Sequence, residues 1–369
     1  MNRHLHIICN NVPWPVNNSK SVDIFCQIEA LYKQGIKIHL HYLCSNQNCH
    51  PTELNRYCES VHTYPSEKQI TNTSIGLDEG YNKIFTALNC DNHPILFEDI
   101  SCAETLKQVA GSQRKVVVRM YDDKCRQNDH LARSAVSFFQ KIRLNRRTSE
   151  LKKQEDMLPK NCIYAFPTIE ITRSSNQDHQ LINARHLPVF SPFHEATGKT
   201  GLGNFCLYHG DLADPCNEKA ALWLLSKVFN DINTPLVIAG NNPGKQLQKL
   251  GKFYSHTCLI ANPSRGEIDD LITKAQINIL PSFSYKLPEL KLVHAIARGR
   301  HCIVNDNAVK GTIYESACHI GKNAAAFKSI ILQLYHQPFE QEEIELRKKI
   351  FNFLNKDEPA TKLTEWLFS

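Results

Sequence analysis

Lys291 is the residue whose type and position most directly suggest chemistry. It lies in the first turn of a helix predicted to begin at Pro288, where the helix dipole and free N–H groups disfavour a cation. The same end of a helix is a favourable site for an anion. A phosphate or carboxylate bound there would explain the lysine, whereas a solvated lysine costs at most about 1 kcal/mol. The sequence therefore indicates an anion site at Lys291, with a solvated surface lysine as the alternative.

The segments around Lys291 must position it, and they have the pattern of a doubly wound sheet. Ile277–Leu280 and His301–Val304 are short apolar runs typical of buried strands. Between them, apolar residues recur at helical spacing, and Gly299 stands where a C-terminal cap is expected. Strand, loop, helix and strand in this order predict an α/β fold with a parallel sheet.

The segment from Pro281-Ser282 to Val304 resembles the donor-binding segment of GT-B glycosyltransferases related to the retaining family 4. Those chains read P-S, a short loop, and then K-x-x-E-A-x-A-x-G-x-P-V-V. The residues in register here are Lys291, Ala295, Ala297 and Gly299. The family's glutamate, which usually binds the nucleotide ribose, is His294 in this chain. The resemblance implies a GT-B fold, in which two Rossmann-like doubly wound domains face a cleft.

The length of 369 residues favours two domains, and the pattern supports this. A strand at Leu5–Cys9, a helix that Ser19 or Ser21 would cap, and a second strand open the first domain. A second β-α-β series begins at Phe205, with Asn217 as the expected cap of its first helix. We predict an N-terminal acceptor domain at 1–195 and a C-terminal nucleotide-sugar domain at 196–340. The resemblance implies that the helices of 341–369 cross back to the first domain.

The composition is that of a soluble globular protein, with 42% hydrophobic and 22% charged residues. The 14 cysteines form no C-x-x-C pair, and we find no signal peptide or membrane-spanning run, so we expect reduced thiols and a cytoplasmic location. The net charge of +6 suits anionic small molecules or an anionic membrane surface. Nothing combines basic and aromatic residues as nucleic-acid-binding proteins do, so we expect no nucleic-acid partner.

A basic helix is predicted over 131–158. Its lysines and arginines share the helix with Phe138, Phe139, Ile142 and Leu151. Such a helix can lie on anionic lipid, which would make the protein peripheral on the inner membrane face. It is also the pattern of a solvated face over a core, and both interpretations remain open.

The resemblance also assigns the donor side of the site. Lys291 would bind the phosphates, His294 and Glu289 the ribose or sugar hydroxyls, and Arg265 with Asn262 would lie near the base. In the loop where the family has a lysine or arginine near a K-G pair, this chain reads Asp214-Pro-Cys-Asn, which shifts phosphate binding to Lys291 and Lys286 or weakens the case for an enzyme. The implied donor-binding residues are Gly210, Asp211, Asn262, Arg265, Lys286, Glu289, Lys291 and His294.

Two segments of the first domain correspond to the acceptor side of the family. The loop Asn10–Ser21 resembles a P-x-P…S segment, with Asn17 and Asn18 in place of glycine. Arg119-Met-Tyr-Asp-Asp resembles R-x-H-N-x-E, with Arg119 matching. The acceptor-side residues are Asn17, Asn18, Lys20 and Arg119, and the catalytic candidates are Lys291, Tyr121 and Asp122.

The activity that the resemblance implies is transfer of a hexose from a nucleotide-sugar to a glycan or lipid-linked acceptor in surface polysaccharide biosynthesis, with retention of configuration as in that family. The sequence has no D-x-D motif, no His/Cys pattern at metal spacing and no P-loop, so we expect no metal and no cofactor. Two alternatives stay open. One is a GT-B protein that has lost catalysis and acts in an assembly complex. The other is a sugar-nucleotide epimerase, which needs carboxylate acid/base residues.

Overall fold

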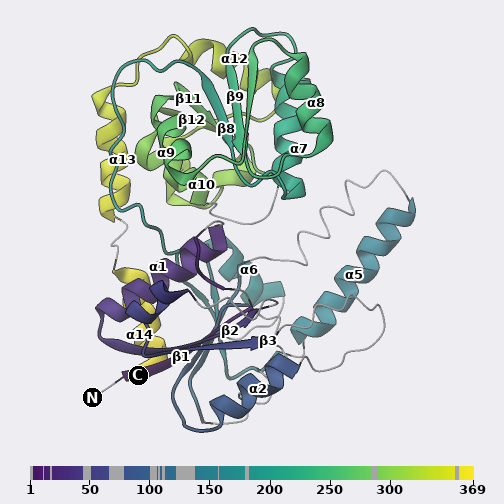
Figure 1. The fold of residues 1–369 in the computed structure, drawn as a ribbon. Coiled ribbons are helices and arrows are strands. Elements are labelled where there is room, and N and C mark those ends of the chain that lie inside the picture. Colours follow the sequence, from purple (N-terminus) through teal and green to yellow (C-terminus); the bar gives the residue numbers. More distant parts are fainter. Residues whose placement is uncertain are drawn as a thin grey trace. The chain divides into compact units, whose positions relative to one another are not determined.

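The computed structural model shows two compact units (Figure 1). The first comprises Met1–Pro192 together with Asp357–Ser369, and the second comprises Phe193–Lys356. The residues that the structure describes are 3–10, 12–16, 19–44, 51–65, 79–99, 106, 109, 113–121, 138–156, 158–178, 183–283, 290–353 and 357–369.

A parallel sheet forms the centre of the first unit. Within the described residues its strand order is β3-β2-β1-β4-β5-β6-β7. The hydrophobic core lies on both faces, which is why the strands read as nearly continuous apolar runs. The strands are β1 (Arg3–Cys9), β2 (Ile36–Cys44), β3 (Ser60–Pro65), β4 (Ile95–Phe97), β5 (Val116–Arg119), β6 (Ile163–Phe166) and β7 (Ala184–His186).

Helices cover this sheet. Helix α1 (Ser19–Lys33) buries Ile24, Ile28 and Leu31, and the chain then turns at Gly35, whose φ of +76° lies in the left-handed region. The last helix, α14 (Glu358–Phe368), packs Leu363 and Leu367 into the same core cluster as α1. The other helices are η1 (Thr52–Arg56), α2 (Glu79–Leu88), α5 (Phe138–Asp156) and α6 (Ile169–Asp178).

The second unit repeats the architecture. Its strand order among the described residues is β10-β9-β8-β11-β12-β13, and the strands pair in parallel. Alternation along β8 sends Leu207 into one core cluster and Tyr208 into another, so this sheet is also buried on both faces. The strands are β8 (Cys206–His209), β9 (Leu236–Gly240), β10 (Thr257–Ala261), β11 (Ile277–Ile279), β12 (His301–Val304) and β13 (His319–Ile320).

The helices of the second unit follow its strands in turn (Figure 1). They are α7 (Pro215–Trp223), which continues as the π-helical η3 (Leu224–Val228), α8 (Lys245–Phe253), α9 (Arg265–Lys274), α10 (Leu290–Arg298), α11 (Asp306–Val309), η4 (Ile313–Ala317), α12 (Ala324–Leu334) and α13 (Gln341–Phe353).

Both sheets have the strand order 3-2-1-4-5-6 of doubly wound nucleotide-binding folds. The order reverses between β1 and β4 in the first unit and between β8 and β11 in the second. Ligands of such sheets bind outside the carboxyl ends of the strands at this switch point. The prediction of an α/β fold with two Rossmann-like domains is confirmed.

Two local predictions were wrong. Ser21 lies inside α1, because the helix already begins at Ser19. The cap of α7 is Asp214 and not Asn217, because Pro215 fits the first helical position and Asp214 accepts hydrogen bonds from the next N–H groups. Helix α10 ends at Arg298, so Gly299 stands at the predicted C-terminal position, with a φ outside the left-handed region. A Cβ atom there would lie 2.3 Å from the amide nitrogen of Asn278, so close packing requires this glycine.

The chain is divided at Pro192, three residues before the predicted boundary at 195. Helix α13 belongs to the second unit, whereas α14 belongs to the first, so the segment 341–369 is shared between the units.

The predicted basic helix appears as α5, although residues 131–137 lie outside the described range. Lys141, Arg143, Arg146 and Arg147 are exposed on it, and so is Ile142. Among the described residues, none of the helices has the length and apolar character needed to cross a bilayer.

Candidate functional site

The turn after β8 is built by side chains that hold its backbone. Gly210 and Asp211 lead from β8 to α7, where the Asp214 carboxylate accepts hydrogen bonds from the Cys216 and Asn217 N–H groups at 2.7 and 3.3 Å. The Asn217 side-chain amide donates to the Asp211 carbonyl at 3.0 Å. The turn is therefore fixed at the carboxyl edge of the sheet, next to the switch point.

Gly240, the last residue of β9, packs closely against the same turn. A Cβ atom at this position would lie 2.0 Å from the Gly210 carbonyl oxygen and 2.7 Å from Leu212. Because Cβ atoms do not approach backbone atoms this closely, only glycine lets the β8–α7 turn lie against the end of β9.

Lys291 contacts this turn from α10. Its ammonium group donates to the side-chain oxygen of Asn217 at 2.7 Å and lies 5.6 Å from the centre of the Tyr208 ring. Tyr208 is buried, and its hydroxyl donates to the Asn217 carbonyl at 2.8 Å. The positive charge predicted to bind an anion is thus held beside the β8–α7 turn, and the Asn217 side-chain amide is one of the groups that orient it.

His209 lies at the end of β8, beside Lys291. Only 4% of the residue is exposed, and its Nε2 atom has no hydrogen-bond partner among the residues that the structure describes. Burial, reinforced by His294 and Lys291, holds the pKa of His209 well below its usual range, so the ring is neutral. A buried ring nitrogen without a partner costs about 1–3 kcal/mol, which makes this atom a candidate contact for a ligand hydroxyl or phosphate.

His294 packs on the other side of His209, with the two ring centres 6.4 Å apart. Its Nε2 atom lies 2.8 Å from Asp269 Oδ1, at ion-pair distance but not in hydrogen-bond alignment. Its ring stacks on Phe193 at 4.3 Å. Burial lowers the pKa of His294 to about 4, although Asp269 opposes this shift. His294 is therefore a neutral ring fixed between α9 and Phe193.

The predicted base-side residues lie after β10. Asn262 has a left-handed φ of 53°, and its side-chain oxygen accepts from the N–H of Asn242 at 2.8 Å. Arg265 is the exposed first residue of α9. The capping box predicted for this helix is confirmed, since the side chains of Ser264 and Glu267 each accept a hydrogen bond from the other's backbone N–H.

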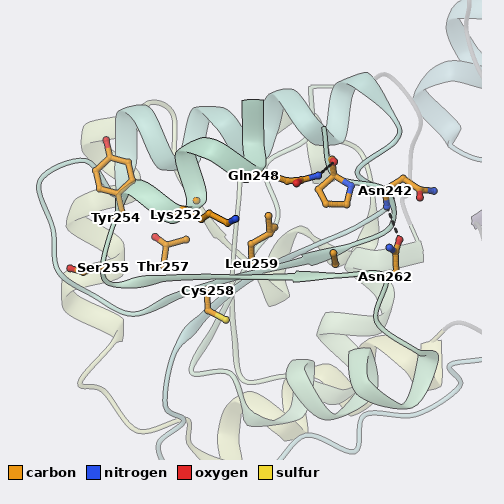
Figure 2. A pocket seen from close by; sticks show the side chains of 12 residues that line it. Asn242, Gln248, Lys252, Tyr254, Ser255, Thr257, Cys258, Leu259 and Asn262 are labelled. Carbon is orange, nitrogen blue, oxygen red and sulfur yellow. Dashed lines mark hydrogen bonds between the residues drawn. The ribbon is translucent and has the colours of Figure 1, made fainter. Parts of the chain in front are cut away.

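A groove of about 820 Å³ runs along the edge strand β10 beneath α8 (Figure 2). Asn242 and Asn262 close one end of it, and Tyr254, Ser255 and Thr257 line the other. Among the predicted site residues, Asn262 alone borders this groove within the described part of the chain. Lys291 and its partners belong to a separate place, at the ends of β8 and α10.

The Pro281-Ser282 loop after β11 is anchored to the end of β12. The Ser282 N–H donates to the Asn305 side-chain oxygen at 2.9 Å, and the Asn305 amide donates to the Ser282 carbonyl at 2.8 Å. These two hydrogen bonds hold the Pro281-Ser282 segment against Asn305. Five predicted site residues lie outside the described residues, namely Asn17, Asn18, Asp122, Lys286 and Glu289.

Arg119 lies in a buried network at the carboxyl edge of the first sheet. Its guanidinium is 3.0 Å from the Asp23 carboxylate and donates to Gln27 at 2.8 Å. Asp23 also accepts from the N–H of Phe190 at 2.6 Å. Because Arg119 is only 2% exposed, its guanidinium N–H groups are directed to partners inside the protein.

Tyr121 and Lys20 extend this network toward the surface. The Tyr121 hydroxyl donates to Glu98, which directly follows β4 and is fully buried. Lys20 pairs with Asp99 at 2.9 Å and lies 4.9 Å from the centre of the Tyr121 ring. Burial raises the pKa of Glu98, while Arg119 opposes the shift, and burial likewise raises the pKa of Tyr121 well above its usual value.

Sequence reasoning missed several members of both sites. The sequence indicates Asn217 only as a helix cap, and it does not single out His209. The polar residues Asp23 and Gln27 stand four apart in an otherwise apolar helix face, and Glu98 directly follows a buried strand. Such buried polar positions are a usable signal, because burial of a polar group requires a partner.

Structural comparison places these sites in a known fold. HepE from Anabaena, in complex with UDP and glucose, matches with a TM-score of 0.67 and 10% identity over 100% of both chains. A variant of TarM from S. aureus, in complex with fondaparinux, alpha-GlcNAc-glycerol and UDP, matches with a TM-score of 0.70 and 9% identity over 100% of both chains. WaaG, a glycosyltransferase involved in lipopolysaccharide biosynthesis, matches with a TM-score of 0.64 and 12% identity over 99% of this chain and 100% of that one.

No protein-family model matches the chain. No curated protein matches it significantly. At identities of 9–12% the structural matches carry the fold. The chain has the GT-B fold of glycosyltransferases. Its predicted place in the retaining family 4 stays a prediction.

Proposed function

We propose that the protein is a glycosyltransferase that moves a hexose from a nucleotide-sugar to a glycan or lipid-linked acceptor. The observation that carries this proposal is the pairing of Lys291 with Asn217 beside the unpartnered Nε2 of His209. These groups lie at the switch point of the second sheet, where doubly wound folds bind phosphates and sugars. The UDP present with HepE and TarM supports a nucleoside diphosphate as the ligand class.

The proposed chemistry is electrostatic. When the glycosidic bond to the diphosphate breaks, negative charge grows on the leaving oxygen, and a fixed positive group lowers the energy of that state. Lys291 supplies the charge, and Asn217 holds its ammonium at 2.7 Å before the substrate binds. His209, which is neutral and buried, would bond a hydroxyl or phosphate oxygen of the donor.

The first unit would present the acceptor. Tyr121, with Asp122, Asn17 and Asn18, would face the acceptor or the sugar, and Lys20 would be held in place by Asp99. Arg119 would act by positioning Tyr121, since its guanidinium lies 4.9 Å from that ring. We further propose retention of the anomeric configuration, a reaction without metal or cofactor, and a cytoplasmic role in surface polysaccharide synthesis.

A thermal-shift screen against UDP, GDP, ADP, CMP and their sugar conjugates tests the donor site. A ligand at about a hundred times its dissociation constant should stabilise the native protein by about 2.7 kcal/mol. We expect one nucleotide to stabilise the wild type and Lys245→Ala, a control that removes an exposed lysine of α8, but not Lys291→Ala. Equal stabilisation of Lys245→Ala and Lys291→Ala would rule out this site. So would the failure of every nucleotide to stabilise the wild type.

A GT-B protein without catalysis is the second candidate. The observation that favours it is His294, which stands where family members have a ribose-binding glutamate and is instead fixed by Asp269 and Phe193. Incubation with the stabilising nucleotide-sugar separates the two candidates. Release of free nucleotide by the wild type but not by Lys291→Ala supports the transferase. Binding of the nucleotide-sugar without release supports the non-catalytic protein.

The exposed basic residues of α5 also fit contact with an anionic lipid surface, as a lipid-linked acceptor would require. Co-sedimentation with anionic vesicles should then weaken when Lys141, Arg143 and Arg147 are replaced by glutamine. Unchanged sedimentation of that variant would remove the membrane from the proposal.

A further inference from the structure

Three potential metal ligands meet at the edge of the second sheet opposite to Lys291. His301 is the first residue of β12, His319 is the first residue of β13, and Glu343 lies in the first turn of α13. One ligand atom from each residue lies within 4.8 Å of the others. His301 stands at the amino-terminal end of β12, away from the carboxyl edge where the donor is expected, and the parallel register places His319 beside Ile303, two residues further along that strand.

The hydrogen bonds of His301 leave one ring nitrogen available. Its Nε2 atom lies 3.1 Å from the Gln337 carbonyl, which can only accept, so Nε2 carries a hydrogen. Its Nδ1 atom faces Glu343 at 3.4 Å, out of hydrogen-bond alignment, and has no closer partner among the described residues, although His301 is fully buried. A histidine that donates one N–H to a backbone carbonyl and keeps the other nitrogen for a metal is the usual arrangement in metal sites.

Glu343 is oriented in the same way. One oxygen accepts from the N–H of Glu340 at 3.2 Å, and the other lies 3.4 Å from Nδ1 of His301. This second distance is longer than an ordinary N–H···O hydrogen bond of about 2.7–3.2 Å. It equals the separation of about 3.4 Å expected for two ligands that each lie about 2.1 Å from a tetrahedral ion.

The surroundings set the strength of the site. Arg347 lies one turn after Glu343 and is buried, and its charge opposes a cation. Its guanidinium is directed to the carbonyl oxygens of Ile296, Gly299 and Arg300. Glu343 is 32% exposed on its side chain, which leaves a fourth coordination position open to water.

We propose that His301, His319 and Glu343 bind a divalent transition-metal ion, for which Zn²⁺ is the best chemical match. Two imidazoles and a carboxylate with one water complete the four-coordinate shell that Zn²⁺ prefers. The ion would join β12, β13 and α13, three elements that are far apart in the sequence. Its role would be structural, since it would tie these elements together and His301 lies at the strand end that the proposed transfer reaction does not use.

Cobalt titration of the tag-free full-length protein tests the site directly. Four-coordinate Co²⁺ absorbs visible light strongly, and we expect this absorption in the wild type, followed by its loss when Zn²⁺ is added. Glu343→Gln and His319→Asn should each weaken Zn²⁺ binding more than tenfold, because even outer-shell changes weaken metal sites 10–100-fold. His336→Asn, which changes an exposed histidine in the adjacent loop, should bind as the wild type does.

Two results would overturn the proposal. One is the absence of four-coordinate Co²⁺ absorption in the wild type, which would leave His301 and Glu343 as an ion pair. The other is Zn²⁺ binding of wild-type strength in both Glu343→Gln and His319→Asn, which would assign the ion to other imidazoles, such as His4 and His39 on the first sheet. Circular dichroism of each variant shows that it is folded, so weaker binding reports on the site.

Discussion

The two units share a strand order and differ in how the polar groups at their carboxyl edges are satisfied. In the first unit, Arg119 lies between Asp23 and Gln27, and Tyr121 donates to Glu98. In the second, the Nε2 atom of His209 has no partner, and Lys291 is oriented by a neutral amide. The same topology therefore carries a network of paired charges in one unit and, among the described residues, a buried ring nitrogen without a protein partner in the other.

This difference separates stability from binding. A network whose charges are paired inside the protein fixes the shape of its loops, and breaking it should harm folding. A polar atom left unpaired by the protein lowers stability and becomes useful when a ligand supplies the partner. The contrast predicts that variants in the first unit will unfold the protein, while variants in the second will mainly lose ligand.

The largest effect is expected for Arg119→Met. It leaves the buried Asp23 and Glu98 without their positive partner, and breaking such a pair costs about 3–5 kcal/mol. Urea unfolding should show this loss, while Arg173→Met, an exposed change in α6, should stay within about 0.5 kcal/mol of the wild type.

Lys291→Met should lose less than about 1 kcal/mol while abolishing nucleotide stabilisation. A loss of unfolding free energy in Lys291→Met as large as that in Arg119→Met would contradict the proposed difference between the two units.

The next effect concerns pH and a histidine pair of the first sheet. His6 and His41 are bonded to each other at 2.9 Å, and burial lowers their pKa values to about 4 and about 3. In the unfolded chain both would bind protons below about pH 6.5. Above pH 6.5 the two histidines therefore do not lower the free energy of unfolding. As the pH falls from 6.5 toward 4, the free energy of unfolding decreases, by on the order of 3 kcal/mol for His6 alone.

Urea midpoints measured from pH 7 to pH 4.5 test this prediction. The decline should be shallower in His6→Phe than in the wild type and unchanged in His336→Gln, whose histidine is exposed. Carboxylates other than Asp91, which lies 3.0 Å from His6, contribute equally to the proteins compared, so the difference reports on His6 and its pairing with Asp91. Parallel curves for His6→Phe and the wild type would show that His6 does not set the slope.

A smaller effect is expected for Gly240→Ala. The new methyl group would collide with the Gly210 carbonyl and with Leu212, and overpacking of this kind costs about 1–3 kcal/mol. Because the collision shifts the β8–α7 turn, nucleotide stabilisation should also weaken. Gly266→Ala is the matched control, since nothing lies within 4 Å of that position in α9 and the change should slightly stabilise the protein. A Gly240→Ala protein as stable as the wild type would show that the turn can move without cost.

The smallest effect on folding is expected for His209→Leu. Leucine fills a similar volume and removes a buried atom without a partner, so stability should stay within about 1 kcal/mol of the wild type or rise. Nucleotide stabilisation should fall, because the ligand loses its bond to Nε2. A strongly destabilised variant would mean that His209 is satisfied within the protein, and unaltered nucleotide binding would remove it from the site.

Much of the fold could be predicted because its signals are local. Apolar runs such as Ile277–Leu280, the helical spacing in α10 and the capping box at Ser264 depend only on residues close in sequence. The alternation of such strands and helices then restricts the chain to parallel doubly wound sheets. The position of Gly299 at the end of α10 was predicted, but the reason for a glycine there was not, because the atom that excludes a side chain belongs to Asn278, twenty-one positions earlier.

The sequence by itself determined the two β-α-β series, the position of Lys291 near the start of a helix and the GT-B resemblance. Only the tertiary structure decided that Asn217 holds Lys291, that His209 keeps an unpartnered nitrogen and that Glu98 and Asp23 surround Arg119. The reason is physical. Secondary structure follows from interactions within a few residues, whereas the charge state and hydrogen-bonding capacity of a buried side chain depend on which distant segments the fold brings against it.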